Sequence, residues 1–170
     1  YTHAPAAGSM LLSGIMLKMG LYGLMRWYIP IVPESISAFA PIITVLALIG
    51  ILYGGFIAIV QNDLKRLIAY SSLSHVGLIA AGIITLRQDA LQGAVFQMVS
   101  HGVNVVGMFM VADIIEQRAR TRDITALGGI AKQAHWFTIA FFVIVLGTMA
   151  VPFTNGFPGE LLLLRGGFSY

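Results

Sequence analysis

Residues 38–60 form one apolar run, AFAPIITVLALIGILYGGFIAIV, that contains no charged side chain. An α-helix needs about 20 apolar residues to cross the hydrocarbon core of a bilayer, so this run is long enough to span it. In lipid every backbone polar group must be paired within the protein, which leaves an open segment only the helical conformation. Residues 67–86 meet the same test and carry no charge apart from His75 when it is protonated.

The composition agrees with a membrane protein. The chain is 58% hydrophobic and 10% charged, whereas soluble domains are about 25% charged. It has no cysteine, which excludes disulfides and iron–sulfur ligation by thiolates. We therefore predict an all-α, polytopic bundle of transmembrane helices in a single domain over residues 1–170. The chain opens on YTHAP without a methionine and stops inside an apolar run, so we expect an internal fragment of a longer chain.

The spacing of apolar runs and turn residues predicts where the helices lie. We expect helices over 6–28, 38–60, 64–86, 89–117 and 135–151, and the start of another over 159–170. This amounts to about five full spans plus a broken helix. The connections are short, and Asn62 or Asp63 is well placed to cap the third helix.

Basic side chains predict the orientation in the membrane. They gather in two loops, as Lys65 and Arg66 in the first and as Arg118, Arg120, Arg122 and Lys132 in the second. Two expected spans separate these loops, so both loops lie on the same side, which the positive-inside rule makes cytoplasmic. Asp113 and Glu116 lie beside the second loop and are expected to form a solvated or partner-facing charge cluster.

Three ionisable side chains are expected at the same depth. Lys18, His75 and His101 each lie near the middle of a different predicted span. A charged side chain at the bilayer centre costs at least about 2.5–3.5 kcal/mol on insertion scales, so such residues face protein or water rather than lipid.

Polar neighbours extend this pattern along the helices. The helical spacing aligns Gln97, Ser100, His101 and Asn104, then Ser71, Ser74 and His75, and then Gly14, Lys18 and Tyr22. Lysine and histidine change charge readily near neutral pH, so the pattern favours a path for protons. Two other interpretations stay open: interhelical hydrogen bonding, typically worth about 0.6–2 kcal/mol each, and a haem between His75 and His101.

The fifth predicted span ends in VPFTNGFPGE, where Pro152, Gly156, Pro158 and Gly159 break the helix before Glu160. Broken helices in transporters expose backbone groups that line a cavity or a site. At the membrane surface Glu160 would only complement a helix N-terminus. Within the membrane it would be a buried carboxylate and a candidate proton site. The pattern alone leaves both depths open.

Four motifs in order resemble one family: THAPAAGSMLLSGIMLKMGLYGLMR, QNDLKRLIAYSSLSHVGLI, GAVFQMVSHG and PFTNGFPGE. Together they are similar to the antiporter-like subunits M of respiratory complex I, the bacterial relatives of mitochondrial NADH dehydrogenase subunit 4. The resemblance covers essentially all of the chain. The opening HAPAAGS and the run MLKMGLYG favour subunit M over the sister subunits L and N.

The resemblance implies a fold, a function and a set of residues. The fold is part of an inverted-repeat antiporter-like bundle, and the function is proton translocation coupled to redox chemistry elsewhere. Lys18 matches the lysine of the family's eighth helix, His75 and His101 match its two membrane histidines, and Glu160 matches the acidic residue of its broken twelfth helix. A further glutamate–lysine pair of the family would lie before Tyr1.

The same resemblance implies the surroundings of the chain. Its partners would be other membrane subunits of complex I, protons and the lipid bilayer of a bacterial inner membrane. NADH and quinone would act only through other subunits, and we expect no cofactor, metal or nucleic acid on this chain.

Two alternatives remain beside this interpretation. One is an Mrp-type cation/proton antiporter subunit or a membrane subunit of a proton-pumping hydrogenase, which share the fold. The other is a non-transporting membrane scaffold, in which the polar stripes only hold helices together.

Overall fold

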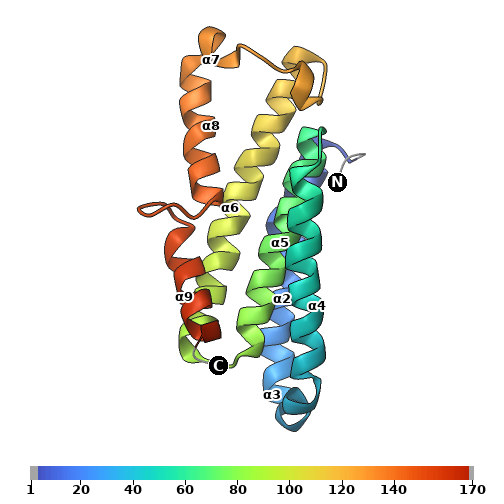
Figure 1. Cartoon of the computed structure of the whole chain (residues 1–170), viewed down its shortest axis with the longest axis vertical. Helices are drawn as coiled ribbons and strands as arrows, with labels where there is room; N and C mark the ends of the chain where they lie inside the picture. Colours follow the sequence, from blue (N-terminus) through green and yellow to red (C-terminus); the bar gives the residue numbers. More distant parts are fainter. Residues whose placement is uncertain (1–3, 169–170) are drawn as a thin grey trace.

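The computed structural model describes residues 4–168, without the side chains at positions 35 and 37, and this part is a bundle of helices (Figure 1). The first span is built from α1 (Ala6–Leu11), η1 (Leu12–Met16), α2 (Leu17–Gly23), η2 (Leu24–Tyr28) and α3 (Ile29–Ile31). The others are α4 (Pro33–Ile59), α5 (Leu64–Ile84), α6 (Gln88–Ala119), η3 (Ile124–Ala126), α7 (Ile130–Gln133), α8 (His135–Thr148) and α9 (Phe157–Phe168).

The first span is one continuous helix with two π-helical turns, and it meets α4 almost directly. Val32, with φ −130°, is the single non-helical residue between them. Residues 29–37, which separate the first two predicted helices, are therefore helical except at Val32. Pro33 occupies the first turn of α4, where the missing N–H group costs no hydrogen bond, and Pro30 lies in the last turn of the first span. Helix α4 consequently begins five residues before the predicted start at position 38.

Within residues 4–168, four helices are long and apolar enough to cross a membrane: the first span, α4, α5 and α6. Helices α8 and α9 are shorter and lie end to end beside α6, separated by residues 149–156 (Figure 1). In this break Ala150 and Phe153 adopt the left-handed region, with φ 49° and 73°. The all-α membrane bundle is thus confirmed, and the expected span over 135–151 is the first half of the broken helix rather than a full crossing.

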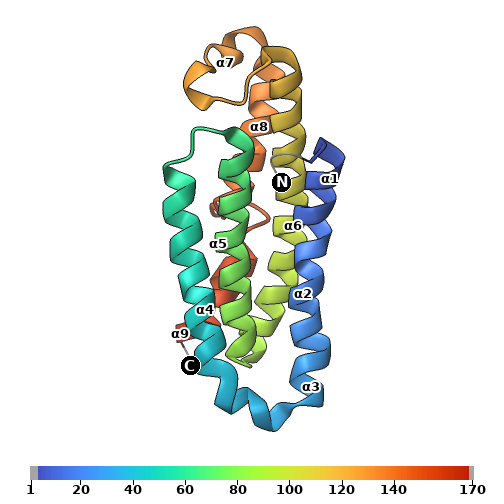
Figure 2. The same cartoon turned by 90° about the vertical axis from the view of Figure 1, so that its right-hand side faces the viewer.

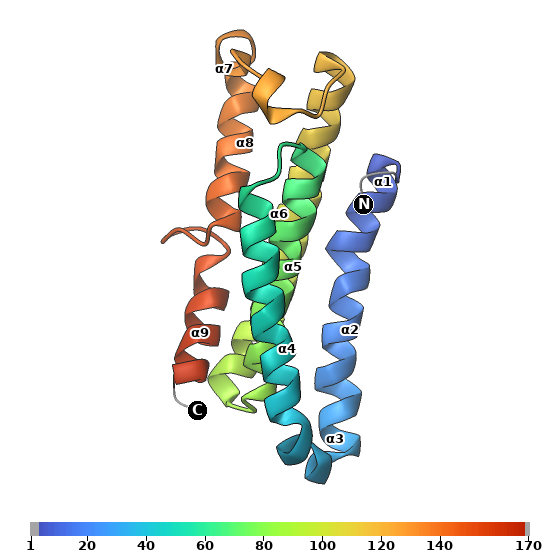
Figure 3. The ribbon, with the colours of Figure 1, turned by 45° about the vertical axis from the view of Figure 1, so that its right-hand side comes forward.

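Helix α6 contacts most of the bundle. It packs against the first span on one side and against α8 and α9 on the other, while α4 packs along α5 (Figure 3). Glycines allow these close approaches: a Cβ at Gly77 on α5 would lie 2.8 Å from the carbonyl oxygen of Ala47 on α4. Small residues at helix contacts are typical of membrane bundles, since packing rather than water exclusion drives their association.

The two basic loops lie at the same end of the bundle, as expected (Figure 2). They are joined by backbone hydrogen bonds from Leu64 N–H to the Arg122 carbonyl, at 3.0 Å, and from Ile124 N–H to the Asn62 carbonyl, at 2.8 Å. Asp63 caps α5 by accepting from the Arg66 backbone N–H at 3.0 Å, which confirms one of the two predicted caps.

Of the two acidic residues beside the second loop, Glu116 is held by ion pairs to two neighbouring elements. Lys65 is buried at the start of α5, with its Nζ 2.8 Å from Glu116 Oε2. The other carboxylate oxygen of Glu116 accepts a bond of 2.6 Å from Arg122 Nε. Glu116 therefore ties α5, α6 and the following loop together, and the prediction of an outward-facing cluster is wrong for this residue.

Candidate functional site

His75 and Glu160 meet in the middle of the bundle. Nδ1 of His75 lies 3.1 Å from Oε1 of Glu160, and each side chain is about four-fifths buried. His75 is halfway along α5, and Glu160 lies in the first turn of α9. The helix break therefore lies level with the middle of α5, and Glu160 is a mostly buried carboxylate near a helix N-terminus in the interior of the bundle.

His101 on α6 completes this central contact. Its ring centroid is 4.9 Å from that of His75, with the two planes at 54°. The two rings contact each other directly. His101 is 3% exposed, and neither ring nitrogen has a hydrogen-bond partner among the described residues. Buried polar atoms nearly always have a partner in proteins, so these nitrogens are natural positions for bound water.

Lys18 is buried at the π-helical turn of the first span. Its Nζ donates to the carbonyl oxygen of Ser13, five residues earlier on the same helix. The Ser13 hydroxyl lies 3.4 Å from that of Ser72 on α5, which itself donates to the Ile68 carbonyl at 2.8 Å. π-Helical turns are rare and frequent at functional sites, because they offset the helical ladder by one residue.

The first span reaches α6 through two glycines. A Cβ at Gly14 would lie 2.7 Å from a methyl group of Val106, and one at Gly102 would lie 3.0 Å from the Gly14 carbonyl oxygen. This approach brings Lys18 and His101 within electrostatic range, although the described part of the chain has no hydrogen bond between them. Tyr22 lies in a groove along this contact and is 51% exposed, so it faces outward in the described chain.

The break between α8 and α9 is held against α6 by an amide pair. Nδ2 of Asn155 donates to Oδ1 of Asn104 at 2.9 Å. Gly147, near the end of α8, makes room for this pair, because a Cβ there would lie 2.7 Å from Asn155 Oδ1. The polar stripe on α6 predicted the face that carries Asn104, but no periodicity could identify Asn155 as its partner.

The predicted stripe on α5 divides into two roles. Ser74 donates to the Ile51 carbonyl of α4 at 3.1 Å, so it links α5 to α4 and does not line the site. His75, one residue later, turns toward α9. Ser72, which the predicted stripe omits, faces the first span instead.

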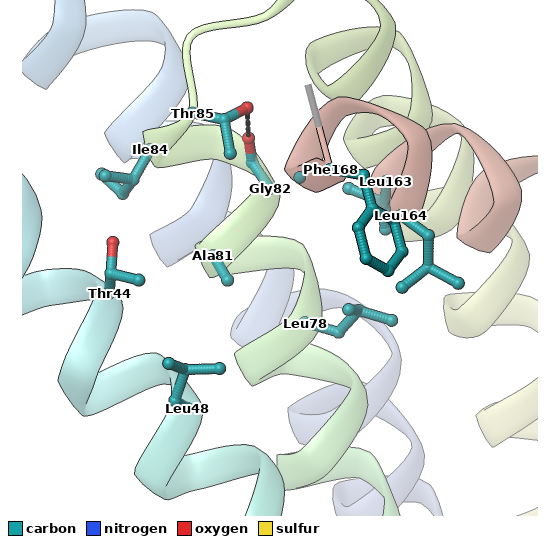
Figure 4. A pocket seen from close by; sticks show the side chains of 11 residues that line it. Thr44, Leu48, Leu78, Ala81, Gly82, Ile84, Thr85, Leu163, Leu164 and Phe168 are labelled. Atoms are coloured by element: carbon teal, nitrogen blue, oxygen red, sulfur yellow. Dashed lines mark hydrogen bonds between the residues drawn. The ribbon is translucent and has the colours of Figure 1, made fainter. Parts of the chain in front are cut away.

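A separate cavity of about 290 Å³ lies between α4, α5 and α9 (Figure 4). Its lining includes Thr44, Leu48, Leu78 and Leu163, and none of the residues that line it is ionisable. The hydroxyl of Thr85 is occupied by a bond of 2.8 Å to the Gly82 carbonyl. The cavity is therefore apolar packing space and does not extend the group of titratable side chains.

Three of the four predicted residues thus contact one another, and the fourth lies beside them. His75, His101 and Glu160 come together from α5, α6 and α9, while Lys18 lies beside them on the first span. Such an arrangement can take up and release protons at the centre of a membrane.

Comparison with known proteins identifies relatives of the whole chain. Residues 1–170 match the model of the family described as NADH:quinone oxidoreductase/Mrp antiporter, transmembrane. NADH-quinone oxidoreductase subunit M of Escherichia coli K12 is 41% identical over 168 residues, which cover 99% of this chain and 33% of that protein. Subunit M of Pseudomonas aeruginosa is 39% identical over the same shares of both proteins. The chain therefore spans about a third of the length of these relatives.

Solved structures have the same fold. A chain of respiratory complex I from Thermus thermophilus with bound NADH superposes with a TM-score of 0.89 at 29% identity, covering 95% of this chain and 35% of that chain. A chain of an archaeal membrane-bound sulfane sulfur reductase superposes with a TM-score of 0.84 at 24% identity, over 96% of this chain and 34% of that chain, which shows the fold alone. This multi-pass membrane chain belongs to the NADH:quinone oxidoreductase/Mrp antiporter family and is similar to its subunits M.

Proposed function

We propose that this chain forms part of a proton-translocating membrane subunit of an NADH:quinone oxidoreductase. The observation that carries the proposal is the contact of His75 with both Glu160 and His101 at mid-depth, with Lys18 adjacent. Neutral amide side chains could hold the helices together by hydrogen bonds equally well, and they would bury no charge.

In this function Lys18 is a proton carrier that alternates between its charged and neutral forms. His75 and His101 relay the proton toward Glu160, with water filling the gaps beside the unpartnered nitrogens of His101. Each change of charge alters the proton affinity of the next group. Protonation of one residue is thereby coupled to protonation of its neighbour. Oxidation of NADH and reduction of quinone take place in other subunits, and this chain contributes no redox centre.

The named relatives support the setting. The subunit would lie in a bacterial inner membrane, packed against other membrane subunits of the complex, with the two basic loops facing the cytoplasm. The many outward-facing apolar side chains, such as Phe56, Ile59 and Val99, then face lipid or neighbouring helices.

An Mrp-type cation/proton antiporter subunit is the second candidate, because the description of the matching family covers both kinds of protein. The two kinds of subunit differ in the energy source for proton movement. An oxidoreductase subunit translocates protons when NADH is oxidised, whereas an antiporter exchanges protons for a cation gradient without NADH.

The decisive experiment is NADH-driven proton uptake into inverted membrane vesicles that contain the intact complex. We expect Lys18→Ala to reduce uptake to the level of vesicles treated with an uncoupler, while NADH–ferricyanide activity shows that the complex has assembled. Lys132→Ala is the matched control, since Lys132 is exposed on the cytoplasmic-side helix α7. Normal uptake in the Lys18 variant would favour the scaffold, and uptake driven only by a cation gradient would favour the antiporter.

A further inference from the structure

Gln97 on α6 contacts the same carboxylate oxygen as His75. Its Nε2 donates to Glu160 Oε1 at 3.1 Å, and Nδ1 of His75 lies 3.1 Å from that oxygen. Gln97 is 3% exposed, so this bond forms away from bulk water. One oxygen of Glu160 thus lies 3.1 Å from two side-chain nitrogens, one titratable and one permanently neutral.

Close packing of α9 on α6 fixes the position of Gln97. A Cβ at Gly159 would lie 2.5 Å from Gln97 Oε1 and 3.1 Å from its Cα. A Cβ at Gly93, one helical turn earlier on α6, would lie 2.9 Å from the Leu163 backbone nitrogen. The two helices therefore touch at the level of their backbones, which leaves the Gln97 side chain little space except toward Glu160.

The amide of Gln97 can serve both charge states of a carboxyl group. In the structure the Nε2 end donates to Glu160, which suits an ionised carboxylate. The Oε1 end is buried and has no hydrogen-bond partner among the described residues. Rotation of the amide by half a turn would present that oxygen to a protonated carboxyl group, which needs an acceptor for its O–H.

Titratable and charged side chains also lie on the elements packed around Glu160. They are His75 on α5, His101 on α6, Lys18 on the first span and Arg165 on α9, whose Nε lies 3.2 Å from Asp89 Oδ2. Gln97 is the neutral group in direct contact with the carboxylate, so its removal changes the hydrogen bonding of Glu160 without changing any charge.

We propose that Gln97 is a positioning residue that holds the Glu160 carboxylate against His75 and sets the pH at which Glu160 takes up a proton. The inference rests on the proposed function, because it assigns Gln97 to the same relay. It makes a separate prediction, however, since the protonation of Glu160 can be measured whether or not the complex pumps.

The test is labelling of Glu160 by a hydrophobic carbodiimide, which reacts with protonated carboxyl groups, in membranes that contain the intact complex. Mass spectrometry of the peptide around Glu160 gives the labelled fraction as a function of pH. Gln97→Leu removes a donor to the ionised form, so the midpoint of labelling should move upward by about one pH unit. Gln97→Glu places a second carboxyl group beside the first and should move it further upward.

Gln92→Leu is the matched control, because Gln92 lies on the same helix but is exposed. Its midpoint should equal that of the unchanged complex. An unchanged midpoint in Gln97→Leu, in a complex that retains NADH–ferricyanide activity, would overturn the proposal and leave Gln97 as an interhelical bond. Absence of labelling at acid pH in the unchanged complex would overturn it too, since Glu160 would then not take up the proton. Loss of pumping in Lys18→Ala tests the proposed function independently of either result.

Discussion

Helix α6 contributes to two groups of ionisable residues that are arranged in opposite ways. At its C-terminal end Glu116 binds both Lys65 and Arg122, so every charge has a partner of the opposite sign. In its middle His101 has no hydrogen-bond partner among the described residues, and Lys18 donates only to a neutral carbonyl there. The first group is saturated and holds the structure together. In the second group the ring nitrogens of His101 stay without such a partner among the described residues, which suits the proton exchange that we propose.

The strongest way to break this comparison is to remove Glu116. Glu116→Ala would leave Lys65 buried without its counter-charge, which typically costs about 3–5 kcal/mol of stability. We expect a lower thermal midpoint of the complex in detergent and less assembled complex in membranes. Asp113→Ala is the control on the same helix, because the Asp113 carboxylate accepts from Gln117 at 2.7 Å and touches no buried lysine. If both variants lowered the thermal midpoint and the amount of assembled complex equally, the ion pairs of Glu116 would not stabilise the complex more than the Asp113 bond does.

A smaller structural effect is expected at the helix break. Asn155→Leu removes the bond to Asn104, and interhelical hydrogen bonds in membranes are worth about 0.6–2 kcal/mol. The variant should assemble with a slightly lower thermal midpoint, and its proton uptake should fall because α9 carries Glu160. Thr148→Val is a suitable control, since the Thr148 hydroxyl bonds only within its own helix, to the Val145 carbonyl at 2.7 Å. A full loss of assembly in Asn155→Leu would mean that the amide pair is a major support of the fold.

The smallest effect on stability, and the largest on function, is expected at Lys18. Lys18→Met removes a charge that insertion scales penalise by about 2.5–3.5 kcal/mol and keeps the shape of the side chain. The thermal midpoint should stay the same or rise, while NADH-driven proton uptake is lost. A clear fall in the thermal midpoint, with uptake retained, would show that Lys18 stabilises the fold, as Glu116 does, and does not carry protons.

Local sequence patterns predicted the helical membrane bundle, the side shared by the basic loops and the cap at Asp63, because these depend on apolar length, loop charge and turn chemistry. The same patterns placed Lys18, His75 and His101 at a common depth. They missed the link between Lys65 and Glu116 and the bond between Gln97 and Glu160, because these join residues far apart in sequence. The gap expected between the first two helices is also reduced to the single residue Val32, because Pro33 begins α4 at a first-turn position.

The break between α8 and α9 also has an electrical consequence. Residues 149–156 place non-helical peptide groups near the middle of the long axis of the bundle (Figure 1). A proton moving between this level and either surface crosses about half of the transmembrane voltage, which corresponds to roughly 1.1 kcal/mol per 100 mV. An energised membrane would therefore shift the proton occupancy of Glu160 in a direction set by the side from which the proton arrives. Carbodiimide labelling of Glu160 under imposed potassium diffusion potentials would measure that voltage dependence and show to which surface the centre of the bundle is open.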